Sequence, residues 1–368
     1  MRPHGALWNI VCEVNALVVV YVLLAIVLFS FLVLAHEFGH FITAKLSGVQ
    51  VNEFSLFMGP ALWKKQKGET LYALRCIPFG GYCAMEGEDG ENENPRAFVN
   101  AKLWKRLIIL VAGAFMNFVV GFLIVLIFLG IFTSTYRSGY MANLRVVDMM
   151  ENRPFVGQLL VGDEFYEIDG RRVFVQNDIT MLLDRKADGV HDIVVLRDGE
   201  KVLLEDLPMS RNPEDGLFGF STGSDTMTFG VLLKESWNQS LDLGRLVWMG
   251  LSDLITGREP VENIAGPVGA VDMVVSTVKQ ADTKGLAILN LIYFFGFISI
   301  NLGVMNLLPI PALDGGRSVC LLVTAVVEKI LRRKINPKYE GYLHAGFMIL
   351  LLAFMAIITF KDVWGLFK

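Results

Sequence analysis

The chain alternates long apolar stretches with shorter polar ones, and the lengths of the apolar stretches predict its overall class. Four stretches are almost free of charged residues, at positions 16–44, 107–133, 286–308 and 344–360. Each is close to or longer than the ~20 residues that a helix needs to cross a bilayer. The pattern therefore predicts a polytopic α-helical membrane protein with about four transmembrane helices.

The segment after the first apolar stretch has a different pattern. Short apolar runs at 54–58 and 71–77 are separated by a turn signal at Lys67-Gly68, and Gly80-Gly81 marks a second turn. Apolar runs of this length bounded by glycine are typical of strands. We expect a membrane-associated β-hairpin element here, although the same pattern also fits a half-buried sheet in water.

Residues 140–210 have the composition of a soluble domain. Expected strands lie at 144–148, 164–168, 171–174, 192–197 and 201–207, and a helix at 178–185. This predicts one extramembrane α+β domain. Residues 225–258 then show apolar positions at helical spacing, with Trp237 and Trp248 on the apolar side. Such an amphipathic helix fits either a membrane interface or the surface of the soluble domain.

Composition supports the membrane class and excludes others. The 368 residues are 53% hydrophobic and 19% charged, below the roughly 25% charged residues of a soluble domain. The net charge of −4 and the lack of a basic block argue against nucleic acid as a partner. The four cysteines form no Cys-x-x-Cys pair, so neither a disulfide framework nor a thiolate zinc site is indicated.

The first apolar stretch ends in the sequence His36-Glu37-Phe38-Gly39-His40. Ionisable groups in a membrane helix cost about 2.5–3.5 kcal/mol each, so a cluster of them indicates a functional site. Residues four apart share one helix face, so His36 and His40 can bind one metal ion. His-Glu-x-x-His is the zinc-metalloprotease signature, with Glu37 as the general base. On a soluble surface helix the same letters would be an ordinary charged face.

A second polar centre lies at the end of the third apolar stretch, in residues 306–316. Two prolines there prevent a regular helix, and irregular backbone at membrane depth is tolerated only against protein or a water-filled cavity. A catalytic zinc needs a third protein ligand. Asp314 lies at the same expected depth as the two histidines, so it is our candidate; alone, it would fit a helix-capping residue. Asn117, inside the second stretch, fits either a hydrogen bond between helices or a contact with substrate.

The loops predict the orientation of the chain. Basic residues concentrate between the first and second stretches and between the third and fourth. By the positive-inside tendency both loops are cytoplasmic. Both termini and the soluble domain are then expected outside, with the metal site towards the cytoplasmic side.

These residues together resemble a known family. The His36-Glu37-Phe38-Gly39-His40 sequence, the run from Asn306 to Gly316 and a PDZ-like sequence at 154–170 resemble the site-2 protease family of intramembrane zinc metalloproteases. The similarity covers nearly the whole chain and is greatest to the RseP-like bacterial group, here with a single PDZ domain. The chain departs from the family by having Gly113-Ala114 where the family usually has Gly-Pro, and it lacks the usual Ala-Gly-Leu before Gly162-Asp163.

The resemblance implies that Zn²⁺ is held by His36, His40 and Asp314 and that Glu37 activates water. It also implies that 54–85 pairs with substrate. The substrate-binding residues expected are Asn306, Asn117, Leu71, Tyr72, Ala73 and Leu74. The expected location is the bacterial inner membrane, and the expected substrates are membrane-spanning proteins already trimmed outside by a site-1 protease.

Two other functions stay open at this point. The chain could be another class of membrane zinc peptidase, or a non-proteolytic scaffold that binds proteins through its PDZ-like domain; Glu37 disfavours the scaffold, because a structural metal needs no general base. The expected domains are 1–53 (first transmembrane helix), 54–100 (β element and loop), 101–134 (second transmembrane helix), 140–210 (PDZ-like domain), 225–258 (amphipathic helix), 259–320 (third transmembrane region) and 321–368 (loop and fourth transmembrane helix).

Overall fold

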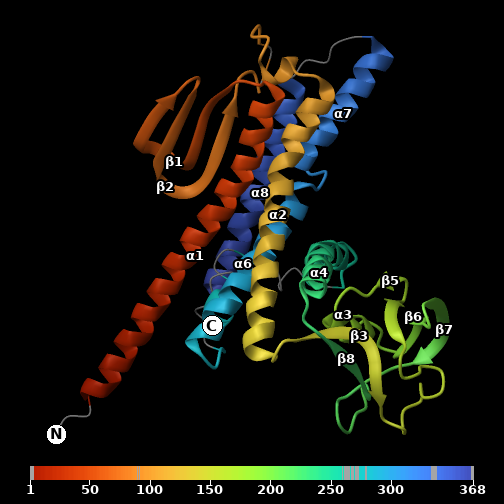
Figure 1. Cartoon of the computed structure of the whole chain (residues 1–368). Coiled ribbons are helices and arrows are strands. Elements are labelled where there is room, and N and C mark those ends of the chain that lie inside the picture. The colour runs from red at the N-terminus through yellow and green to blue at the C-terminus, as the bar shows by residue number, and fades with distance from the viewer. Residues whose placement is uncertain are drawn as a thin grey trace. The chain divides into compact units, whose positions relative to one another are not determined.

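The structure is a computed structural model of the whole chain (Figure 1). It describes residues 4–88, 90, 92–258, 260, 266, 269, 273–277, 280–332 and 338–365. The chain divides into two compact units. The first combines Met1–Ile124 with Val247–Lys368, and the second is Val125–Leu246. Each unit is described by itself.

Long helices dominate the first unit. They are α1 (His4–Ser47), α2 (Leu103–Tyr136, which continues into the second unit), α6 (Lys284–Asn306), α7 (Asp314–Leu331) and α8 (Lys338–Gly365). Among the described residues, four segments are long and apolar enough to cross a membrane: Ile26–Ser47, Leu103–Tyr136, Lys284–Asn306 and Tyr339–Trp364. They lie in the four stretches that the sequence predicts, so the prediction of four candidate spans is confirmed.

The candidate spans leave most of their apolar surface uncovered by protein. Only 6% of the most apolar window of α8 and 17% of that of α2 is buried, against 39% for α6. A helix that is apolar on all sides and remains exposed needs an apolar surrounding. The exposure of α8 and α2 therefore fits helices that face lipid.

A small sheet beside α1 is formed by β1 (Val51–Lys67) and β2 (Thr70–Met85) (Figure 1). The hairpin turn contains Gly68 at φ 61°, where the sequence predicts it. Both strands bend, so 53–58 of β1 pairs with 71–77 of β2 on one side, and 51–56 pairs with 81–85 on the other. The resulting four segments run in the order 61–67, 70–77, 51–56, 81–85. The two outer edges are therefore 61–67 and 81–85.

The second unit contains a larger sheet with strand order β7-β6-β4-β3-β8, and β5 pairs with β4. The strands are β3 (Tyr140–Met149), β4 (Glu164–Ile168), β5 (Arg171–Arg172), β6 (Val190–Arg197), β7 (Glu200–Pro208) and β8 (Phe220–Thr226), with helix α3 (Gln176–Leu183) between β5 and β6. Large apolar side chains of the sheet and helix, among them Phe165, Ile179 and Ile193, form a core that is almost fully buried.

The five expected strands and the expected helix of this unit all overlap observed elements. Strand β8 differs, because it lies past the expected domain boundary at residue 210. Its sequence, Phe-Ser-Thr-Gly-Ser-Asp-Thr, lacks the apolar alternation that predicts a strand. It is held instead by pairing along β3, from Tyr140–Thr226 to Met149–Phe220.

Helix α4 (Phe229–Ile255) buries a partly polar face. Ser236, Ser240 and Asp242 are buried. Trp237 and Trp248, on the apolar stripe seen in the sequence, are 49% and 53% exposed. Up to Leu246 the helix belongs to the second unit, and there its partly polar face is buried. The placement of the apolar stripe at a membrane interface stays a prediction.

Candidate metal centre

The three side chains that the sequence suggests as metal ligands lie close together. His36 and His40 lie on one face of α1, and Asp314 lies in the first turn of α7. The His36 Nε2 and His40 Nε2 atoms are 3.2 Å apart, and Asp314 Oδ2 is 3.2 Å and 3.3 Å from them. Among the described residues these three form the group whose ligand atoms could hold one metal ion.

The distances fit a tetrahedral zinc ion. Zinc binds histidine nitrogen and carboxylate oxygen at about 2.0–2.2 Å, which places any two tetrahedral ligand atoms roughly 3.3 Å apart. The buried Asp314 Oδ2 atom has no hydrogen-bond partner among the described residues. An unpartnered buried carboxylate oxygen that faces two histidine nitrogens is explained by a cation between them.

The ring of His40 is oriented by a backbone carbonyl. His40 Nδ1 lies 2.8 Å from the carbonyl oxygen of Ile109 in α2, and the side chain is buried. Because a carbonyl can only accept, Nδ1 carries the proton and the lone pair of Nε2 is directed at the metal position.

The ring of His36 is oriented by Asn117, whose side chain is 1% exposed. The Asn117 amide lies 3.3 Å from His36 Nδ1 through its Nδ2 atom, while its Oδ1 atom is buried without a partner. With the two amide atoms exchanged, Oδ1 accepts the Nδ1 proton of His36. The Asn117 side chain therefore contacts the ring of a candidate metal ligand on the neighbouring helix α1. A hydrogen bond between helices is one of the two roles that the sequence allows.

A glycine in α2 makes room for the two imidazoles. A Cβ atom on Gly113 would lie 2.3 Å from His40 Nε2 and 2.7 Å from His36 Cε1. Any other residue there would displace the rings. The sequence pattern did not indicate a role for this position in the site, although Gly113 lies between two alanines one turn before Asn117, and small residues in a membrane helix are a signal of close packing.

Glu37 lies beside one edge of the small sheet. A Cβ atom on Gly81 would be 3.4 Å from Glu37 Cγ, so the edge segment 81–85 passes directly over the glutamate. The aromatic rings of Phe41 in α1 and Phe54 in β1, 4.9 Å apart, hold the sheet against the helix. The carboxylate thus lies next to His36 in sequence and next to segment 81–85, an outer segment of the sheet, in space.

The loop between α6 and α7 carries Asp314 to the histidines. The sequence predicts irregular backbone at its two prolines, and the loop indeed separates the two helices. It packs so tightly on the first turn of α7 that a Cβ atom on Gly316 would lie 2.1 Å from the carbonyl oxygen of Ile310. The glycines after Asp314 therefore set the position of the ligand.

The other expected substrate-binding residues are not part of this cluster. Asn306 ends α6 and is half-buried, and its side chain has no hydrogen bond among the described residues. Residues 71–74 form the middle of the small sheet, where each pairs with β1 on both sides; Tyr72, for example, pairs with Phe54 and Lys65. Their backbone is already paired on both sides, so a further strand cannot be added there. The expectation that Leu71, Tyr72, Ala73 and Leu74 bind substrate stays a prediction.

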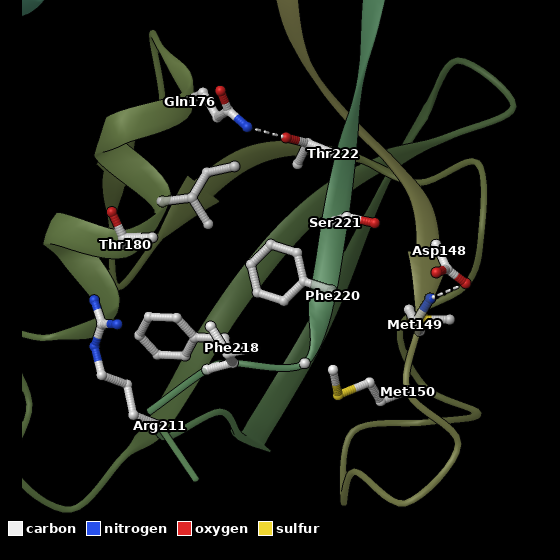
Figure 2. A pocket seen from close by; sticks show the side chains of 13 residues that line it. Asp148, Met149, Met150, Gln176, Thr180, Arg211, Phe218, Phe220, Ser221 and Thr222 are labelled. Carbon is white, nitrogen blue, oxygen red and sulfur yellow. Dashed lines mark hydrogen bonds between the residues drawn. The ribbon is translucent and has the colours of Figure 1, made fainter. Parts of the chain in front are cut away.

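The second unit has a pocket of its own, separate from these residues. Its volume is about 430 Å³, and it lies between α3 and the edge strand β8 (Figure 2). The rings of Phe218 and Phe220 line it, and the Gln176 amide donates to the Thr222 hydroxyl across it at 2.6 Å. The hydrogen bond connects the two walls of the groove.

Comparisons with known proteins agree with this site. A model of peptidase family M50 matches residues 24–354. A Clostridium perfringens protein named as a zinc metalloprotease is 35% identical over 351 residues, which cover 93% of this chain and 98% of that protein. A Fusobacterium nucleatum protein named in the same way is 32% identical over 358 residues, covering 94% and 99%.

A more distant relative has a more specific name. The Bacillus subtilis protein named regulator of sigma-W protease RasP is 25% identical over 440 aligned positions, which cover 93% of this chain and 98% of that protein. Family match, relatives and site geometry agree. The chain belongs to peptidase family M50, the site-2 proteases, and is a zinc metallopeptidase with several candidate membrane-spanning helices.

Proposed function

We propose that this chain is an intramembrane endopeptidase, which hydrolyses peptide bonds within or near the transmembrane segments of other proteins. The observation that carries the proposal is the position of the site: His36, Glu37 and His40 belong to the candidate span Ile26–Ser47, and Asp314 follows the candidate span Lys284–Asn306. The name of the sigma-W relative supports regulatory membrane proteins, such as anti-sigma factors, as substrates. Remnant signal peptides are of the same chemical class.

The residues divide the work in a way that their positions support. His36, His40 and Asp314 would hold the zinc ion, which when bound lowers the pKa of a coordinated water and polarises the scissile carbonyl. Glu37 takes the proton of the attacking water and passes it to the amine that leaves. Ile109 and Asn117 keep the unprotonated nitrogens of both rings directed inwards.

A helical substrate must unfold locally before it can react, because its carbonyls are bound within the helix and an unpaired backbone is costly in lipid. We assign the pairing surface to segment 81–85 of β2. It is an outer edge of the sheet, and it passes over Glu37. Strand addition there would pair the freed backbone groups and hold the scissile bond extended beside the catalytic carboxylate.

The second unit acts as a gate on the outer side of a bacterial inner membrane. The resemblance of 154–170 to PDZ domains supports this role, as do the groove between α3 and β8 and the basic loops that predict a cytoplasmic metal site. In this proposal both termini lie outside. Substrates pass the gate only after a site-1 protease has shortened their external part.

The test of the proposal compares the wild type with Glu37→Gln on a single-span reporter protein whose external part has been shortened. We expect cleavage by the wild type and at least a 100-fold loss in the variant, since a general base contributes about 10²–10⁴-fold. Zinc content, measured on the purified proteins, should be unchanged.

The matched control is Glu200→Gln, the same change at the exposed first residue of β7 in the second unit. It should cleave as the wild type does. Equal cleavage by wild type and Glu37→Gln would show that Glu37 is not the base.

A further inference from the structure

The backbone of the loop that precedes Asp314 is held in part from outside the loop. The two prolines have no N–H group, and the N–H groups of Ile310 and Leu313 each donate to a carbonyl within the loop. The N–H of Ala312 has no backbone acceptor among the described residues. It donates instead to Nδ1 of His344 in α8, at 2.8 Å.

Ala312 has a backbone conformation that needs such support. Its φ angle is +84°, in the left-handed region that residues with a Cβ atom rarely adopt. A conformation of this kind persists when surrounding contacts determine it, and such residues concentrate at functional sites. Ala312 is two residues before Asp314, so a change in its backbone would move the carboxylate.

His344 is an unexpected residue in its helix. Only 6% of the most apolar window of α8 is buried by protein, which fits a helix that faces lipid. An ionisable residue in such a helix is costly and indicates a function. The His344 side chain is 18% exposed and turns towards the loop.

The hydrogen bond defines the state of the imidazole. Nδ1 accepts the N–H of Ala312, so the neutral ring carries its proton on Nε2. Nε2 is buried and has no hydrogen-bond partner among the described residues, and a carboxylate oxygen of Glu340 lies 3.7 Å away. The bond to Ala312 is thus the ring's one hydrogen bond in the described part of the chain.

We propose that His344 is a positioning residue for the third metal ligand: by accepting the Ala312 N–H, it fixes the turn that places Asp314 against His36 and His40. The inference rests on the proposed metal site. His344 itself lies outside the ligand set, and it acts through the backbone of the loop.

The test measures zinc affinity by competition with a chelating dye, on full-length protein in lipid nanodiscs. His344→Leu removes the acceptor and should weaken zinc binding about 10-fold or more, since outer partners of metal ligands contribute 10–100-fold. His344→Asn keeps an acceptor near the position of Nδ1 and should bind within a few-fold of wild type. In cobalt-substituted protein, the absorption spectrum should change in the leucine variant and stay unchanged in the asparagine variant.

The control on the same helix is Thr359→Val, because the Thr359 hydroxyl donates to a carbonyl within α8. It should leave zinc affinity and the cobalt spectrum unchanged. Wild-type affinity in His344→Leu would overturn the inference, as would equal weakening in the leucine and asparagine variants. His36→Ala separates the role of His344 from the metal site on which it rests: if this variant binds zinc as tightly as wild type, the assignment of the metal site itself is wrong.

Discussion

Part of the candidate site consists of groups that orient the metal ligands without binding the metal themselves. The spacing of His36, Glu37 and His40 predicts a metal site, and the need for a third ligand predicts Asp314. The sequence could not show what orients each ring, because the partners, a carbonyl of Ile109 and the amide of Asn117, come from a different helix. That pairing depends on how closely α1 and α2 approach.

The role of Asn117 gives a prediction at this scale. Asn117→Leu leaves the Nδ1 proton of His36 unpaired in a buried site, so zinc affinity should fall by about 10–100-fold. Asn117→Asp keeps an acceptor and should bind zinc within a few-fold of wild type. Metal competition titrations measure both.

The control for Asn117 is Ser299→Ala. The Ser299 hydroxyl donates to the Asn117 backbone carbonyl at 2.8 Å, away from the ring. Its loss should leave zinc affinity unchanged. If Asn117→Leu also binds zinc normally, the amide contacts something other than the ligand, and the substrate role becomes the better explanation.

At the scale of elements, the small sheet gives the clearest prediction. Alternate N–H groups of an edge strand point outwards, so one of the two neighbours Tyr82 and Cys83 has an outward donor. Proline has no N–H group. When it replaces each of the two residues in turn, one of the two variants loses the outward donor. In that variant, cleavage of the reporter should be lost while zinc is retained. Proline placed in turn at Lys64 and Lys65 makes the same change on the opposite edge in one of the two variants, and that variant should leave cleavage intact. Cleavage retained in both the Tyr82 and the Cys83 variant would exclude strand addition at 81–85.

Which segments form the edges of this sheet could not be predicted from sequence. The two strands and the turn at Gly68 follow from local pattern, and both are observed. Which segment is central depends on the bend of β1 near Phe57, at φ +70°, and of β2 near Gly80, at φ +68°. These bends fold the hairpin back on itself, so 71–77, apolar enough to suggest a substrate strand, becomes the interior of the sheet.

A second prediction at this scale concerns the attachment of α4 to α3. One guanidinium nitrogen of Arg245 contacts Asp178 at 2.6 Å and Asp242 at 2.5 Å. Burial, followed by the charge of Asp178, raises the pKa of Asp242 to about 7. The stabilisation that this carboxyl gives is complete below pH ~4, where it is protonated in both folded and unfolded chains, and is lost as the pH rises through 7.

Thermal unfolding of the full chain should therefore show lower stability at pH 8 than at pH 5, by an amount on the order of 1–4 kcal/mol from this group. Asp242→Asn stays neutral, so it should unfold at a higher temperature than wild type at pH 8 and reduce the difference between the two pH values. Asp225→Asn, at an exposed position, should keep it. A pH dependence unchanged by Asp242→Asn would contradict the assignment.

At the scale of the whole molecule, the second unit has a boundary that determines how its role is tested. Because β8 pairs along β3, a deletion that ends at residue 210 would leave an unpaired strand. Replacing Tyr140–Thr226 by a short flexible linker removes the complete sheet. If this unit is a gate, the wild type should cleave a reporter with a folded external domain at least 10-fold more slowly than the trimmed reporter. The deletion variant should cleave the reporter with the folded domain.

The control for this deletion is the trimmed reporter, which both proteins should cleave at similar rates. Retained discrimination between the two reporters after the deletion would place the selection of substrates elsewhere in the chain. The sequence predicts that this domain exists, but its end at β8 emerges only from pairing between strands far apart in the chain.

The asymmetry of the small sheet limits how many chains can occupy it. Its outer segment 61–67 carries Lys64, Lys65 and Lys67, all exposed, and lysines on an edge oppose the addition of another strand. In the proposed mechanism, only the edge at 81–85 then accepts a substrate strand. The enzyme should therefore bind one extended peptide per molecule, and a peptide that occupies that edge without being cut should act as a purely competitive inhibitor with one-to-one stoichiometry.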